Sequence, residues 1–326
     1  MPDPTLSIAS PASANRPIEV GLFVPPSEIP HLGSISSWND LVAFAIRAEA
    51  LGFDSLWLGD HLLLDFGPDK APIGCWDCWS LLAALAAATN RIELGPLVSC
   101  TGYRNPAMLA KMADTVEEIS GGRLILGLGA GWHEPEFHSF GFPYDHRVSR
   151  FEEALQIIVP LLRGEHVDVE GRYHQAQNCQ LRPRGPRPVG PPILVGANGP
   201  RMMRLAATYA DVWDSDFIAN PTDLPPLRAM LHDLDAACSE VGRDPATLRR
   251  TASFSVNLSG HSQPEDHWMA EGRIAGKPAT GSPEQLAALL MAYAAEGIDR
   301  VQVWLDPNTL DAIEAFATVL ELLEQG

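Results

Sequence analysis

The chain has 326 residues, an apolar fraction of 46% and a formal net charge of −18. This length and apolar content predict a globular protein with a substantial core, whereas the negative charge argues against anionic partners, namely nucleic acid and membrane surfaces. No apolar run reaches the roughly 20 residues that a membrane-spanning helix needs.

The amino-terminal segment and the cysteines bear on the cellular compartment. Residues 1–16 are rich in Pro, Ala and Ser and lack the basic and apolar regions of a secretory signal, so we expect a disordered tail followed by one domain over 17–326. The five cysteines are odd in number and scattered, which favours the reducing cytoplasm over a disulfide framework. Cys75 and Cys78 form CWDC, but without a second pair they predict neither a zinc site nor redox chemistry.

Short apolar segments alternate along the chain with longer amphipathic ones. The short segments predict buried strands at 18–24, 54–60, 91–98, 123–131, 192–197, 211–216, 251–258 and 300–305. The amphipathic segments predict helices at 38–51, 80–89, 106–120, 147–163, 200–210, about 223–241, 283–296 and from about 308. Ser37 with Asp40 is typical of a helix start. Gly52 and Gly297 end helices before two strands of similar pattern, where glycine permits a left-handed turn.

Eight strand–helix units in about 300 residues predict a closed (β/α)8 barrel, an α/β fold of the TIM-barrel type. An open doubly wound sheet is the alternative, and it is weakened because no GxGxxG motif follows the first strand. Residues 164–192 and 259–282 are too long for simple connections, so we expect insertions over the carboxyl-terminal face of the barrel. The second insertion holds Trp268, Met269 and Arg273, to which the sequence assigns no role.

Asp60 and His61 are two ionisable residues inside the apolar run LWLGDHLLL. They follow the second predicted strand, at the face of a barrel where active sites lie. Because an unpaired buried charge is costly, the pair has either structural partners or a chemical task. A helix-capping Asp beside a hydrogen-bonded His is the structural alternative, and catalysis or cofactor contact is the functional one.

Four segments together resemble the bacterial luciferase-like superfamily: LWLGDH, RIELGPLVSCTGYRNPAMLAKMADTVEEISGGRLILGLGAGW, FGFPYDHRVSRFEEALQII and PPILVGANGPRMMRLAATYADVW. The resemblance covers most of residues 18–215. It implies the same barrel, with either reduced FMN and oxygen or coenzyme F-420, a deazaflavin, for hydride transfer. The deazaflavin branch is favoured because the FMN monooxygenases often have Glu-His where this chain has Asp60 and His61.

The segment GANGPRMMRLAA, residues 196–207, is a candidate phosphate site. Its glycines allow the backbone to approach a ligand closely, Pro200 suits a first helical turn, and the helix start offers N–H groups to an anion. Alone, this pattern is typical of an ordinary strand-to-helix turn. With the resemblance, it predicts that the cofactor phosphate binds at Gly196, Ala197, Asn198 and Gly199.

The cofactor ring is predicted to lie against the ends of the third and fourth strands. Pro96 falls inside a strand pattern and indicates a bulge or an unusual peptide bond, and the resemblance implies a non-proline cis peptide at or beside Pro96–Leu97. Gly129, Ala130 and Gly131 end the fourth strand without bulky side chains, which leaves room for a ring. A tight turn is the alternative explanation of these small residues.

The resemblance also implies roles for polar residues. Asp60 would hydrogen-bond the polar edge of the ring, and His61 would exchange a proton with the substrate, as an imidazole can near neutral pH. The family's sugar-phosphate dehydrogenases have a Glu after the fourth-strand glycines, where this chain has Trp132, so sugar-phosphate oxidation is disfavoured. Trp132 and His133 are instead predicted to line a substrate pocket, although a core Trp is equally typical at a barrel rim.

HEPEFH, residues 133–138, does not predict a metal site, because its histidines are five residues apart and Pro135 intervenes. We therefore expect an oxidoreductase that transfers hydride between coenzyme F-420 and a small organic substrate. The alternatives are an FMN-dependent monooxygenase served by a separate flavin reductase, a non-catalytic ligand-binding barrel and, last, a metal-dependent hydrolase. Members of the superfamily are often dimers, and the helix over 80–89 would permit a homodimer.

Overall fold

A computed structural model describes residues 16–28, 37–68, 71–258 and 276–325. Eight parallel strands form a barrel, in the spatial order β5 (Glu93–Pro96), β2 (Ser55–Leu58), β1 (Glu19–Val24), β14 (Arg300–Leu305), β12 (Arg249–Asn257), β11 (Val212–Phe217), β10 (Ile193–Gly196) and β7 (Leu126–Gly129). The circle closes where Leu94 bridges Leu124 and where the short strand β6 (Ser99–Cys100) pairs with β7. All eight strands lie where the sequence predicts, so the (β/α)8 TIM barrel is confirmed.

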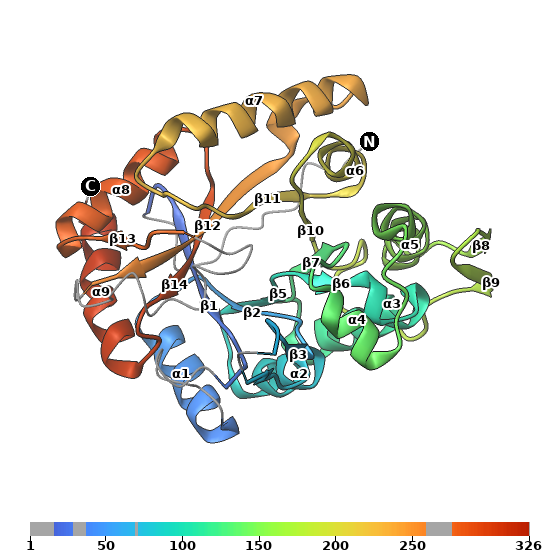
Figure 1. Ribbon diagram of the computed structural model, residues 1–326, viewed down its shortest axis with the longest axis horizontal. Helices are drawn as coiled ribbons and strands as arrows, with labels where there is room; N and C mark the ends of the chain where they lie inside the picture. The colour runs from blue at the N-terminus through green and yellow to red at the C-terminus, as the bar shows by residue number, and fades with distance from the viewer. Residues whose placement is uncertain (1–15, 29–36, 69–70, 259–275, 326) are drawn as a thin grey trace.

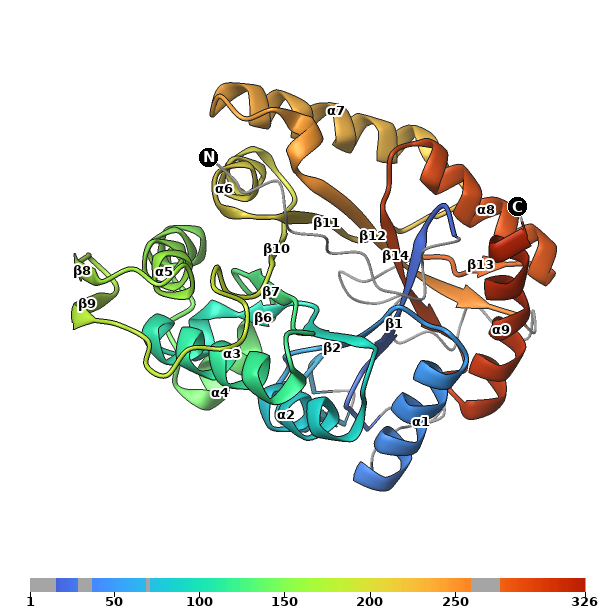
Figure 2. The ribbon, with the colours of Figure 1, turned by 180° about the vertical axis from the view of Figure 1, so that it is seen from behind.

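Helices form an outer layer around the strands (Figure 1, Figure 2). One long helix follows each barrel strand: α1 (Trp38–Ala50), α2 (Cys78–Ala88), α3 (Pro106–Ser120), α5 (Arg147–Leu162), α6 (Pro200–Tyr209), α7 (Leu224–Glu240), α8 (Pro283–Ala295) and α9 (Leu310–Gln325). The smaller elements are helix α4 (Glu134–Phe140), the 3-10 turns Thr101–Tyr103 and Pro245–Thr247, and an antiparallel pair of β3 (Leu63–Leu64) and β4 (Ile73–Gly74). Within the described ranges, no helix is long and apolar enough to cross a bilayer.

Capping residues define the helix ends that the sequence predicts. At the start of α1, the Ser37 hydroxyl accepts the backbone N–H of Asp40 at 3.2 Å. Gly52 and Gly297 follow α1 and α8 with φ angles of 91° and 86°, a left-handed conformation that favours glycine. Both turns lead into strands that are buried along their whole length, β2 and β14.

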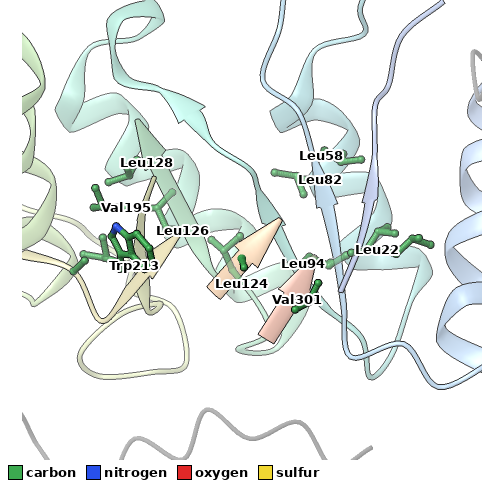
Figure 3. Close-up of a cluster of buried hydrophobic side chains, with 14 of the residues drawn as sticks. Leu22, Leu58, Leu82, Leu94, Leu124, Leu126, Leu128, Val195, Trp213 and Val301 are labelled. Atoms are coloured by element: carbon green, nitrogen blue, oxygen red, sulfur yellow. The ribbon is translucent and has the colours of Figure 1, made fainter. Parts of the chain in front are cut away.

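Two apolar layers hold the barrel together. The outer faces of the strands pack against the helices through buried side chains that include Leu58, Leu126 and Trp213 (Figure 3). A second cluster fills the barrel interior with Phe23, Trp57, Ile125, Leu194, Val212 and Trp304. Because burial of one large apolar side chain contributes about 2 kcal/mol, these layers are the main source of stability.

Ion pairs close the amino-terminal end of the barrel. Arg300, the first residue of β14, contacts the carboxylate of Glu19, the first residue of β1. Arg16 pairs with Asp54 at 2.8 Å, and both side chains are fully buried. Arg16 is therefore part of the fold, which corrects the predicted boundary of the disordered tail. The rest of that tail, 1–15, lies outside the described residues.

The insertion at 164–192 does not lie over the carboxyl-terminal face, contrary to expectation. It contains the antiparallel strands β8 (Val167–Glu170) and β9 (Gln175–Cys179), which lie on the outer side of α5 (Figure 1). Arg187 then pairs with Glu117 in the last turn of α3 and with the carbonyl of Leu124, just ahead of β7. The prediction is wrong because this insertion follows a helix: it starts beside the amino termini of the strands and runs back along the outer side of α5, where Tyr173 packs on Arg150 in the first turn of that helix.

The insertion at 259–282 is described only from residue 276 onward. There, β13 (Ala279–Thr280) pairs with the last residues of β12, and the N–H of Lys277 donates to the carbonyl of Ala219, which follows β11. This part lies at the carboxyl-terminal face, as predicted. Trp268, Met269 and Arg273, which have no assigned role, lie outside the described residues.

Candidate active site

A cavity of about 420 Å³ opens at the carboxyl-terminal ends of the barrel strands. Its wall contains ten of the predicted site residues: Asp60, His61, Leu97, Gly129, Ala130, Gly131, Trp132, Gly196, Ala197 and Asn198. The other three, Pro96, His133 and Gly199, do not line it. The wall also contains residues to which sequence analysis assigned no role, among them residues of β1, β11 and β14.

The third strand of the barrel is broken, as Pro96 predicts. β5 ends at Pro96 and β6 begins at Ser99, and the Leu97–Val98 peptide between them is cis, beside the Pro96–Leu97 bond. Leu97 and Val98 thereby become part of the cavity wall. A Cβ atom on Gly129 would lie 2.5 Å from Cγ2 of Val98, so glycine is needed here to admit the valine rather than to leave room for a ligand.

The Asp60 carboxylate is buried and engaged by the protein itself. It accepts the Ser99 hydroxyl at 2.8 Å, the Cys100 N–H at 3.1 Å and two nitrogens of Arg104 at 2.6 and 3.0 Å. Asp60 therefore ties the end of β2 to the β6 segment. With four donors bound, little acceptor capacity is left for the ring edge that sequence analysis assigned to Asp60.

His61 is held by a carboxylate that sequence analysis missed. Its Nδ1 lies 2.9 Å from Oε2 of Glu136, and the same carboxylate accepts the Tyr103 hydroxyl at 3.0 Å. The backbone N–H groups of Leu62 and Leu63 donate to the other oxygen of Glu136. Burial alone would raise the pKa of Glu136, but the bonds from His61 and the backbone lower it below its usual value. An ionised Glu136 keeps the proton on Nδ1, which leaves Nε2 of this cavity-lining ring as the proton acceptor.

Glu136 was missed because sequence analysis considered a Glu only at the position directly after the fourth-strand glycines, where the family's sugar-phosphate dehydrogenases have one. That position is Trp132, which lines the cavity and meets the His61 ring edge to face, with centroids 5.5 Å apart. The carboxylate is supplied instead by α4, a helix with Pro135 in its first turn. A proline followed by an acidic residue in HEPEFH is the sequence signal that would have indicated this helix.

His133 is a core residue rather than a substrate contact. It is 5% exposed, and its Nε2 accepts the backbone N–H of Asp65 at 3.0 Å. Burial lowers the pKa of His133, which favours the neutral imidazole that this bond requires. The structure therefore corrects the predicted pocket role of His133.

One end of the cavity is suited to an anion. Helices α5 and α6 both begin here, and no described side chain caps either of them, so their first-turn N–H groups can serve a ligand. Arg147 and Val148 of α5 and Met202 of α6 line the cavity. The Arg147 guanidinium is held by the carbonyl of Gly131 and by the ring of Tyr144, whose centroid is 4.3 Å away.

The loop before α6 completes this anion site. Gly199 has a φ of 82°, and a Cβ atom there would meet nothing within 4 Å, so its backbone faces open space. Asn198 beside it is exposed, and the carbonyl of Ala197 accepts the indole N–H of Trp213 at 3.0 Å. Two uncapped helix starts, an arginine and an open glycine loop fit the phosphate of a flavin or deazaflavin cofactor.

The other reactive side chains limit the chemistry of the site. Within the described part of the chain, no cluster of three or more His, Cys, Asp or Glu is suited to a metal ion. Cys75 and Cys100 line the cavity, but burial raises the pKa of each thiol to about 12, so neither is a nucleophile near neutral pH. Asp214 of β11 also lines the cavity, and burial raises its pKa to about 7.

The sequence matches a known family model along most of its length. The model, described as luciferase-like monooxygenase, matches residues 18–266. The chain belongs to the luciferase-like monooxygenase family. The barrel is thus the fold of a luciferase-like enzyme.

Relatives of this luciferase-like enzyme include two proteins of Mycobacterium tuberculosis. A phthiodiolone/phenolphthiodiolone dimycocerosates ketoreductase is 31% identical over 269 residues, which cover 77% of this chain and 68% of the relative. An F-420-dependent hydroxymycolic acid dehydrogenase is 34% identical over 224 residues, 66% of this chain and 58% of the relative. Among solved structures, an F-420-dependent secondary alcohol dehydrogenase shares the fold with a TM-score of 0.75 at 19% identity, over 94% of this chain and 99% of that one.

Proposed function

We propose that this enzyme transfers hydride between coenzyme F-420 and a small organic substrate that is a secondary alcohol or the corresponding ketone. The observation that carries the proposal is His61, which lines the cavity while ionised Glu136 binds its Nδ1. Alcohol oxidation and ketone reduction both exchange one proton at the substrate oxygen, and Nε2 can exchange it. The relatives named as a ketoreductase and as an F-420-dependent dehydrogenase support the same chemistry.

Two parts of the cavity would hold the cofactor. The phosphate would bind at the starts of α5 and α6, where Arg147 and Asn198 line the cavity and Gly199 beside them has its backbone in open space. The ring would rest on Leu97 and Val98, the apolar link between β5 and β6. When bound, the deazaflavin accepts or supplies the hydride.

The proton would move through Nε2 of His61. In the oxidative direction, Nε2 takes the proton of the substrate hydroxyl while hydride leaves the adjacent carbon, and reduction reverses both transfers. Glu136 stabilises the imidazolium that forms, because an ionised carboxylate lies 2.9 Å from Nδ1. Trp132 packs edge to face against the His61 ring and helps to hold its orientation.

Anaerobic turnover tests this function. The purified protein is incubated without oxygen with oxidised F-420 and a panel of secondary alcohols, and the loss of F-420 absorbance is followed. Reduced FMN with oxygen is assayed in parallel. The proposal predicts oxygen-independent reduction of F-420. Activity restricted to reduced FMN with oxygen would contradict it and would indicate a monooxygenase that depends on a separate flavin reductase.

A further inference from the structure

Strand β11 contains a bulge that places three of its side chains in the cavity. Asp214 lies opposite Thr251 of β12 while Phe217 lies opposite Ser253, so β11 has one residue more than its partner between these pairs. Asp216 lies in the bulge with a φ of 64°. Asp214, Asp216 and Phe217 all line the cavity, whereas regular alternation would turn Phe217 outward.

Asp214 is a buried carboxyl with unused hydrogen-bonding capacity. It is 2% exposed and accepts the Thr251 hydroxyl at 2.7 Å, the Asp216 N–H at 2.9 Å and the Ser253 hydroxyl at 3.3 Å. A carboxylate has about four acceptor positions, so one remains for a ligand in the cavity. Within the described ranges Asp214 forms no ion pair, and burial accordingly raises its pKa to about 7.

Phe217 belongs to an aromatic wall in the same part of the cavity. Its ring centroid lies 5.3 Å from that of Phe23 on β1 and 5.8 Å from that of Trp304 on β14. Phe23 and Trp304 are themselves 5.3 Å apart. In the strand order, β14 and β11 each lie three strands away from β5, whose end carries the Leu97–Val98 link on which the cofactor ring would rest, and β1 lies two strands away. The space between them is therefore bordered by an apolar wall and by the Asp214 carboxyl.

We propose that the β11 bulge is the substrate-specificity element of this enzyme: Asp214 receives a hydrogen-bond donor of the substrate, and the wall of Phe23, Phe217 and Trp304 packs against its apolar body. The substrate class is then an apolar, ring-containing ketone or secondary alcohol with a second polar group, a hydroxyl or N–H. The identity of the reacting group rests on the proposed function. An analogue without the donor binds more weakly than the substrate, because it excludes water from the Asp214 carboxyl and offers no hydrogen bond in its place.

Two ketones of one carbon skeleton test this inference. Benzylacetone has a phenyl ring and no donor, and raspberry ketone is the same molecule with one phenolic hydroxyl on the ring. Their dissociation constants are measured by calorimetry on the purified protein, without cofactor and with oxidised F-420, which does not reduce ketones. Asp214→Asn weakens the acceptor, Asp214→Ala removes it, and Phe217→Ala opens the wall. Ser215→Ala is the matched control in the bulge, because Ser215 bonds the carbonyl of Asp216 and does not line the cavity.

At about pH 8, where Asp214 with its pKa of about 7 is ionised, the wild type and Ser215→Ala are expected to bind raspberry ketone about tenfold or more tightly than benzylacetone, because one charge-assisted hydrogen bond is gained. The preference should fall to about threefold or less in Asp214→Asn and vanish in Asp214→Ala, with benzylacetone affinity retained. Phe217→Ala should weaken both probes by a similar factor of about ten. Equal affinity of the wild type for the two ketones, no binding of raspberry ketone, or an unchanged preference in both Asp214 variants would overturn the inference.

The same titrations separate this inference from the proposed function. A preference that depends on Asp214 in a protein that does not bind F-420 would reject the proposed function and retain the specificity element. F-420 binding with a preference that ignores Asp214 would retain the function and reject the element. Thermal unfolding of each variant shows that it is folded, and the two Asp214 variants provide independent readings of the same site.

Discussion

Nδ1 of His61 lies 2.9 Å from Oε2 of Glu136, which joins the end of β2 to helix α4. The Glu136 side chain is fully buried and that of His61 is 23% exposed, so the pair runs from the protein interior to the cavity. Hydrogen bonds keep the pKa of Glu136 below its usual value despite burial, and its charge holds the imidazole in one tautomer. This arrangement is suited to a base that serves a ligand in the cavity.

Replacement of His61 separates chemistry from cofactor binding. His61→Ala is expected to lower kcat by about 10²–10⁴-fold, because the proton-exchanging group is lost. Affinity for F-420 should change by less than about threefold, since the phosphate end of the site lies at α5 and α6. Steady-state kinetics and equilibrium titration measure the two effects. Normal turnover in the variant would remove His61 from the mechanism.

Glu136 is expected to act through His61 as a positioning residue. Glu136→Gln keeps the shape of the side chain and removes its charge, so kcat should fall by about 10–100-fold while KM changes little. The acidic limb of the kcat/KM profile should move to lower pH, because a neutral amide does not stabilise the imidazolium. Tyr103→Phe, which spares the carboxylate, is the milder control. A loss of kcat with an unchanged pH profile would assign Glu136 a structural role alone.

Asp60 is expected to contribute to stability as well as to the site. Its carboxylate is fully buried and bound by Arg104, so Asp60→Asn leaves a guanidinium poorly paired and should lower the free energy of unfolding by about 3 kcal/mol. Asp77→Asn is the control, because Asp77 is the half-exposed second partner of Arg104 and should cost less than about 1 kcal/mol. Urea unfolding measures both. Equal stability of Asp60→Asn and the wild type would contradict the structural role of the Asp60–Arg104 pair.

Features that depend on a few neighbouring residues were predictable from the sequence. The strands are short apolar runs between turns, and the broken third strand follows from Pro96, which cannot continue a sheet ladder. The open loop at Gly199 and the placement of His61 at a strand end are equally local signals. The resemblance to a family added the chemistry that these local patterns do not specify.

Features that depend on distant contacts were not predictable. Glu136 meets His61 across 75 residues, and it does so from a seven-residue helix too short to show an amphipathic period. In the sequence, Arg147 has the pattern of the first residue of a surface helix. Asp214 lies in the cavity because of the register in which β11 pairs with β12, and the sequence does not show that register. The insertion at 164–192 was misplaced because its length does not indicate which end of the barrel it occupies.

Arg147 is expected to recognise the cofactor phosphate. Arg147→Gln should weaken F-420 binding by about 10–100-fold, since a charge-assisted contact is lost, whereas Arg147→Lys should retain part of the affinity. The deazaflavin chromophore without its phosphate-bearing tail should bind the wild type and the glutamine variant within about twofold. Fluorescence titration gives all of these constants. A similar loss of affinity for both ligands would show that Arg147 does not act on the phosphate.

Asp214 should make stability depend on pH. Burial raises its pKa from 3.8 to about 7, with the neighbouring Asp216 carboxylate adding to the rise, so the unfolded chain releases the proton at lower pH than the native protein does. The protonated Asp214 carboxyl therefore stabilises the native state fully below about pH 4. This stabilisation is lost as the pH rises to about 7, which lowers the free energy of unfolding by up to about 4 kcal/mol. Asp214→Asn should remove this fall. Asp233→Asn, at an exposed carboxyl of α7, controls for the loss of one charge. Parallel pH profiles of Asp214→Asn and the wild type in urea unfolding would reject the effect.

Binding of F-420 and FMN to the purified protein tests the central claim most directly. Each cofactor is titrated separately, and absorbance and fluorescence are followed to saturation. The proposed hydride transfer predicts micromolar binding of F-420, with FMN weaker by about tenfold or more. Tighter binding of FMN would contradict it and identify an oxygen-using monooxygenase, and binding of neither cofactor would contradict the assignment of the anion site at α5 and α6 as well.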